Sequence, residues 1–139
     1  MTRSFLAGLL AVLSLAACDP RLTYESNLSL REVQTLAGVW EGQSGITWSD
    51  DNDCPRFYVW AFRVANGNVE GDVVDRATPN APRAKFTTFL DYDGSMTATA
   101  RAGGRDTLIR GALQRDSFVG EAKSKACSYR LRLRRTASS

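Results

Sequence analysis

The feature that most constrains the fold is a strict alternation of side chains near the end of the chain. Residues 127–134 read Cys-Ser-Tyr-Arg-Leu-Arg-Leu-Arg, so apolar and polar residues alternate at period two. This pattern is typical of a strand with one face in a core and the other in water. Similar short stretches recur from residue 39 onward, separated by turn pairs such as Asn66-Gly67, Asp93-Gly94 and Gly103-Gly104. The sequence therefore predicts an all-β fold.

About eight strands are predicted. They cover residues 39–42 with a continuation near 46–48, and then 56–65, 68–76, 84–91, 96–101, 107–113, 117–123 and 127–134. Hairpin turns join most of them, which favours an antiparallel meander, and closing a meander on itself removes its exposed edges. We therefore expect an antiparallel up-and-down β-barrel.

A short N-terminal helix is expected before the first strand. Ser29 and Glu32 have the spacing of a capping box, apolar residues recur at positions 30, 33 and 36, and Gly38 is a natural helix stop. This pattern predicts about two helical turns, which would pack on one end of the barrel.

The tripeptide Gly38-Val39-Trp40 opens the first predicted strand directly after this helix. It resembles the Gly-x-Trp of the calycin barrels, which include lipocalins, avidins and the small periplasmic metalloprotease inhibitors. The length of the chain is closer to the avidin and inhibitor barrels. In lipocalins an Arg of the final strand stacks over the Trp, and the resemblance gives that place to Arg130 or Arg132.

The first 17 residues have the order of a secretory signal peptide: a charged start at Arg3, an apolar run from 5 to 15, and small residues at 16 and 17. The run is shorter than the roughly 20 residues of a membrane-spanning helix. Leu15-Ala16-Ala17-Cys18 resembles the lipobox of bacterial lipoproteins, whose Cys receives a diacylglycerol before the signal is cut. The resemblance implies that Cys18 is lipidated and anchors the chain in a membrane.

We therefore expect the chain to consist of a lipoprotein signal peptide at 1–17, a lipidated tether at 18–28 and one β-barrel domain at 29–139. The lipid anchor would place the barrel in the periplasm of a bacterial cell envelope. Asp19 resembles the inner-membrane retention signal of enteric bacteria, and the outer membrane is the alternative.

Two cysteines remain after Cys18, namely Cys54 and Cys127. Because export carries a protein into an oxidising compartment, we expect these two thiols to form a disulfide.

The end of the chain is basic. Residues 101–139 carry ten Lys or Arg against three Asp or Glu, whereas residues 19–100 carry seven against twelve. The arginines form either a solvated strand face or a surface for anionic headgroups or an acidic partner. Export removes the protein from nucleic acid, so a nucleic-acid partner is not expected.

The sequence carries little catalytic chemistry. It has no His, and it shows neither Ser-x-x-Lys nor paired carboxylates, so we expect no enzyme, no cofactor and no zinc site. The stretch Asp50-Asp51-Asn52-Asp53 offers oxygen ligands for calcium but lacks the spacing of a calcium loop. A solvated loop is expected there.

The strand at 56–65 is apolar on both faces, with Tyr58, Trp60 and Phe62 on one and Phe57 and Val59 on the other. We expect one face in the core and the other beneath the helix or a loop, and the alternative is an exposed partner site. Elsewhere the inward positions are small, and these leave either a ligand cavity or a filled core: Met96, Ala98, Ala100, Gly111, Gly120 and Ala122.

The expected function is that of a membrane-anchored envelope lipoprotein. It would act as a non-catalytic binding or accessory module for a protein partner or a small apolar ligand. One alternative is a periplasmic protease inhibitor of the calycin-like barrel type, with the segment before Gly38 inserted in an enzyme cleft. Another is a structural subunit of an envelope complex.

Overall fold

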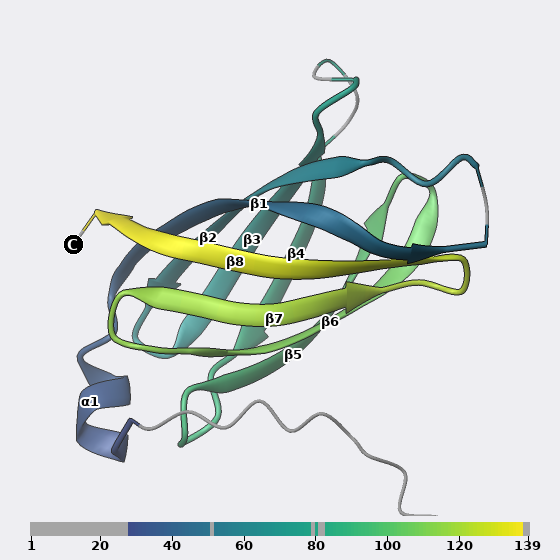
Figure 1. Cartoon of the computed structure of the whole chain (residues 1–139). Helices are drawn as coiled ribbons and strands as arrows, with labels where there is room; N and C mark the ends of the chain where they lie inside the picture. The colour runs from purple at the N-terminus through teal and green to yellow at the C-terminus, as the bar shows by residue number, and fades with distance from the viewer. Residues whose placement is uncertain (1–27, 51, 79, 81–82, 138–139) are drawn as a thin grey trace, which may run out of the picture.

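The computed structural model describes residues 28–50, 52–78, 80 and 83–137. The predicted signal peptide, Cys18 and Asp19 lie outside this range. One helix and eight strands make up the fold (Figure 1): α1 Leu30–Gln34, β1 Gly38–Ser49, β2 Phe57–Ala65, β3 Asn68–Asp75, β4 Ala84–Phe89, β5 Ser95–Ala102, β6 Arg105–Leu113, β7 Ser117–Lys123 and β8 Cys127–Ala137. No helix in this range is long and apolar enough to cross a membrane.

The eight strands form one antiparallel sheet in the order β4-β3-β2-β1-β8-β7-β6-β5. The sheet curls into a nearly closed barrel (Figure 1), which confirms the predicted fold class. β4 and β5 flank the seam, where the Thr88 hydroxyl donates a 2.7 Å hydrogen bond to the Thr97 carbonyl oxygen. The strand β1 lies between β2 and β8, so the first and the last strand are neighbours.

The first strand differs most from its prediction. It runs unbroken through Gln43, Ser44 and Gly45, where the polar residues suggested an interruption. Ser44 is fully buried, and its hydroxyl accepts a 2.8 Å hydrogen bond from Trp60 Nε1. Because the buried hydroxyl has this partner, the polar residue is tolerated inside the barrel. The register against β8 shifts between Ile46 and Trp48.

The capping box of α1 is confirmed, since the Ser29 side chain accepts from the Glu32 backbone and the Glu32 side chain accepts from the Ser29 backbone. The helix ends at Gln34, with Thr35 as its C-cap. Gly38 is therefore not the helix stop: it is the first residue of β1, with a φ of 143°. The helix is held on the barrel by buried Val33 and by an ion pair of Glu32 with Arg115.

The barrel has two distinct ends (Figure 1). We call one the helix end, because α1 lies there with the β2–β3, β4–β5 and β6–β7 turns. We call the other the disulfide end, because the β1–β2 connection and the start of β8 meet there through Cys54 and Cys127. This disulfide confirms the predicted pairing.

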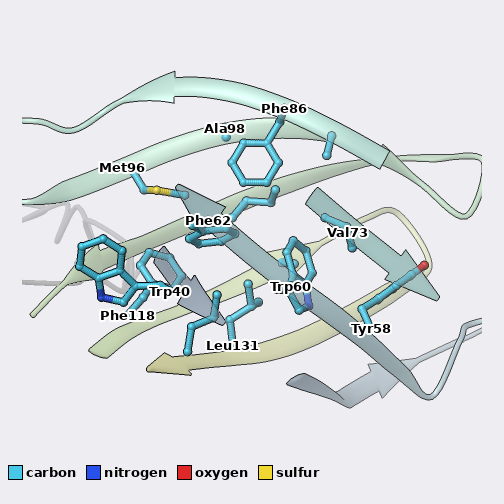
Figure 2. Close-up of a cluster of buried hydrophobic side chains, with 14 of the residues drawn as sticks. Trp40, Tyr58, Trp60, Phe62, Val73, Phe86, Met96, Ala98, Phe118 and Leu131 are labelled. Carbon is cyan, nitrogen blue, oxygen red and sulfur yellow. The ribbon is translucent and has the colours of Figure 1, made fainter. Parts of the chain in front are cut away.

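The core is a chain of aromatic rings in edge-to-face contact (Figure 2). Tyr129 contacts Tyr58 at 5.0 Å between ring centroids, Tyr58 contacts Trp60 at 6.0 Å, and Trp60 contacts Phe62 at 6.2 Å. Phe62 then contacts both Phe86 and Phe118. Aromatic rings in this geometry favour one another beyond the area they bury. The inward face of β2 thus supplies the central column of the core.

Candidate functional site

The interior of the barrel is filled by aromatic rings. A Cβ added to Gly71 would overlap the ring of Phe86, and one added to Gly111 would overlap the ring of Phe118. The small inward residues therefore make room for large rings from neighbouring strands. The five best-formed hollows among the described residues lie at the surface or the ends of the barrel. The outer wall is therefore the place where a partner could bind.

The disulfide end is closed by two tyrosines beneath the Cys54–Cys127 bridge. The Tyr129 hydroxyl donates a 2.9 Å hydrogen bond to the Pro55 carbonyl oxygen. Burial raises the pKa of Tyr58, and burial together with the neighbouring Tyr58 raises the pKa of Tyr129. Both hydroxyls therefore stay neutral at ordinary pH. The two tyrosines serve to pack this end of the core.

The arginine over Trp40 is Arg135, whose guanidinium carbon lies 5.2 Å from the ring centroid. Arg135 also donates to the Ala37 carbonyl oxygen. The prediction of Arg130 or Arg132 for this place is wrong, because both are exposed on the outer face of β8. Arg135 continues the inward row of the alternating pattern by one more step beyond Leu133, and this signal was present in the sequence.

The acidic stretch at 50–53 shows no metal site within the described residues. Asp50 donates its backbone N–H to the Ala126 carbonyl oxygen, and Asp51 lies outside the described range. No group of three or more His, Cys, Asp or Glu side chains in that range is placed to hold a metal ion.

The outer face of β2 lies open. Phe57 is 48% exposed and Val59 39% exposed. The expectation that a helix or loop covers this face is wrong, because α1 packs on the end of the barrel instead of its side (Figure 1). The structure shows an exposed apolar row on this face, as the alternative of a partner site requires.

Beside this row, Trp48 of β1 lies in a groove of about 600 Å³ that continues across β8 and β7. Trp48 is 49% exposed. The groove also contains the cations Lys123, Lys125 and Arg130 and one carboxylate, Glu121. The strand register explains the grouping: Trp48 pairs with Ser128, which pairs with Lys123, and Gly45 pairs with Arg130, which pairs with Glu121.

Phe57 joins this groove to the open face of β2. It pairs with Gly45, and its ring lies 3.9 Å from the place that a Gly45 Cβ would occupy. Gly45 pairs on its other side with Arg130, so Phe57 and Arg130 stand at the same level of the sheet on either side of β1. We call the combined area the Trp48 surface, and its residues are Trp48, Phe57, Val59, Lys123, Lys125 and Arg130.

Within the described part of the chain, the cations of the Trp48 surface make no ion pair, although Glu121 lies opposite Arg130 in the strand register. Neither Lys123, Lys125 nor Arg130 makes an ion pair or a side-chain hydrogen bond with a residue that the structure describes. In contrast, Arg115 pairs with Glu32 at 3.0 Å, and Arg101 lies 3.7 Å from Asp106. The surface thus combines exposed aromatic rings with three unpaired positive charges.

The predicted basic end and the predicted aromatic strand meet on this surface, although the sequence places them far apart. Pairing of β1 with β8 brings them together, and no local pattern specifies that pairing. Trp48 itself precedes the acidic stretch, and its inclusion in the site follows only from the strand order.

No protein-family model, curated protein or solved structure matches this chain. Its class is therefore defined by the fold and the surface described above. It is a small, disulfide-linked antiparallel β-barrel with a filled core and a cationic aromatic surface on its outer wall.

Proposed function

We propose that this protein is a lipid-anchored module of the bacterial cell envelope that binds an acidic protein partner through the Trp48 surface and performs no catalysis itself. The observation that carries the proposal is the grouping of exposed Trp48 and Phe57 with unpaired Lys123, Lys125 and Arg130. Aromatic and arginine side chains are enriched where proteins bind one another. Unpaired cations around them select an acidic surface.

The filled core supports a protein partner over a small apolar ligand. Barrels that hold a small ligand keep an open interior, whereas rings of Phe86 and Phe118 occupy the space above Gly71 and Gly111. The Trp48 surface is also spread over four adjacent strands, β2, β1, β8 and β7. A broad and shallow area suits another protein better than a small molecule.

The proposed lipid anchor and the proposed location in the envelope are argued from the sequence. The Leu15-Ala16-Ala17-Cys18 lipobox supports an acylated Cys18, and Asp19 supports the inner membrane. Acyl chains on one cysteine hold a protein firmly on a bilayer when two or more are present. The Cys54–Cys127 disulfide is consistent with an oxidising compartment.

The test begins with site-specific photo-cross-linking in cells that make the full chain. A photoreactive phenylalanine analogue replaces Phe57, and a matched variant carries it at Thr99, an exposed position on β5 away from the Trp48 surface. We expect one protein to be cross-linked from position 57 and not from position 99. Equal cross-linking from both positions would contradict the proposal.

The second stage uses that purified partner. Trp48→Ala should weaken its affinity by about tenfold or more, because a central aromatic side chain is lost. Lys123→Glu should slow association and reduce its dependence on salt, while Thr99→Ala should leave both unchanged. If neither Trp48→Ala nor Lys123→Glu changes the affinity, the Trp48 surface is not the binding site.

A further inference from the structure

A second group of exposed apolar side chains lies at the helix end of the barrel. Leu30 of α1 is 56% exposed, Phe89 at the end of β4 is 72% exposed, and Tyr92 in the β4–β5 turn is 78% exposed. Leu30 and Tyr92 line one shallow hollow together with Leu90. We call Leu30, Phe89 and Tyr92 the helix-end tip. Phe89 and Tyr92 are the two most exposed large apolar side chains among the described residues.

The tip lies at the end where the described chain begins. Leu28, the first described residue, lines a hollow with residues 114–117 of the β6–β7 turn, which also belongs to the helix end. Leu28 follows Cys18 by ten positions in the sequence. Even fully extended, a stretch of this length reaches at most about 35 Å. An anchor at Cys18 therefore keeps the start of α1 within about 35 Å of the membrane surface.

The chemistry of the tip suits the interfacial region of a bilayer. Leucine and phenylalanine side chains gain free energy by leaving water, and tyrosine favours the headgroup level with its ring in the apolar layer and its hydroxyl in water. The carboxylates of Asp91 and Asp93 lie on the same turn and accept hydrogen bonds from Ser95. Charged groups so close to Tyr92 limit the contact to the headgroup region.

We propose that the helix-end tip lies in the surface of the bilayer that carries the Cys18 anchor, so that the barrel stands with its disulfide end and the Trp48 surface away from the membrane. This inference rests on the lipid anchor of the proposed function and is independent of any protein partner. A barrel oriented by three apolar contacts presents the Trp48 surface in a fixed direction, whereas a tether alone leaves the barrel free to rotate.

The experiment uses the protein extracted from the membranes of cells that make the full chain and reconstituted in vesicles that contain phosphatidylcholine brominated near the headgroup end of its acyl chains. Tyr92→Trp places a fluorescent reporter in the tip, and Phe57→Trp is the matched control at the opposite end. The wild-type signal of Trp40, Trp48 and Trp60 is subtracted. We expect the reporter at 92 to emit at shorter wavelength and to be quenched at least about threefold more than the reporter at 57.

A mass spectrum of the same sample distinguishes a failure of the inference about the tip from a failure of the proposed lipid anchor. If acyl mass is present and position 92 is quenched no more than position 57, the inference about the tip is overturned while the anchor stands. If acyl mass is absent, the anchor and the orientation that rests on it both fail. Phe89→Trp gives a second reporter, and it should be quenched like position 92.

Discussion

At the scale of single residues, Trp40 and Arg135 close one end of the barrel. Trp40 is fully buried, and its Nε1 has no hydrogen-bond partner among the described residues. The Arg135 guanidinium lies over the ring and donates to the Ala37 carbonyl oxygen. It therefore ties β8 both to the first strand and to the segment that leads out of α1.

Replacing Arg135 by methionine should remove the cation over Trp40 and the hydrogen bond to Ala37 while keeping much of the side-chain volume. We expect the free energy of unfolding to fall by roughly 1 to 3 kcal/mol, because a partly buried cation–π contact and a buried hydrogen bond are lost together. Urea denaturation measures the change. Arg134→Met, at an exposed position of the same strand, should change the stability by less than about 0.5 kcal/mol. Equal effects at 134 and 135 would contradict this role.

At the scale of elements, the sequence was sufficient for the number of strands, their approximate bounds and their inward faces. Period two in β8 and turn pairs such as Asn66-Gly67 determine these locally. Whether the outer face of β2 is covered was not predictable, because alternation says nothing about what packs beside a strand. The need for glycine at positions 71 and 111 was not predictable either. It arises because the rings of Phe86 and Phe118, on neighbouring strands, occupy the space that a side chain at those positions would fill.

The candidate site was predictable only in its parts. Basic residues at the end of the chain and aromatic residues around position 57 were both visible in the sequence. Their union depends on the long-range pairing of β1 with β8 and on the register that sets Gly45 against Arg130. Long-range register is fixed by the whole sheet, so a pattern of a few residues cannot specify it.

The α1 capping box gives a stability that depends on pH. Hydrogen bonds from the Ser29 backbone, then from the Ser29 hydroxyl and Arg115, lower the pKa of Glu32 from 4.5 to about 2. A lowered pKa means that the stabilisation is complete above pH 4.5 and is lost as the pH falls toward 2. We therefore expect the difference in unfolding midpoint between wild type and Glu32→Gln to shrink between pH 5 and pH 2.

Thermal unfolding followed by circular dichroism at several pH values measures this difference. Glu70→Gln, which changes an exposed carboxylate on β3, controls for the loss of one negative charge. If wild type and Glu32→Gln lose stability in parallel over this range, the capping box does not contribute the pH dependence.

At the scale of the whole molecule, the barrel is held shut in three ways. The β1–β8 ladder joins its first and last strands, the Thr88–Thr97 hydrogen bond bridges the seam, and the disulfide joins residues that are 73 positions apart. A cross-link over so long a loop stabilises a protein mainly by restricting the unfolded chain. The covalent link thus acts on the molecule as a whole and not on one strand pair.

Removing this link should lower the free energy of unfolding by about 4 kcal/mol, which is the loop-entropy value for a closed loop of this length. The measurement is urea denaturation of the Cys54→Ser/Cys127→Ser double variant, compared with the wild type under a reducing agent. Both should unfold at the same, lower urea concentration. If the reduced wild type is as stable as the oxidised one, the cross-link makes no thermodynamic contribution.

The pairing of β1 with β8 also determines how late in synthesis the barrel can close. The Thr136 hydroxyl donates to the carbonyl oxygen of Val39, 97 residues earlier in the chain. One edge of β1 therefore has no hydrogen-bonded strand beside it until β8 has been synthesised. Closure of a sheet between such distant segments is slow, because the loop must be ordered before the contacts form. We therefore expect the barrel to close only after its last strand has been synthesised.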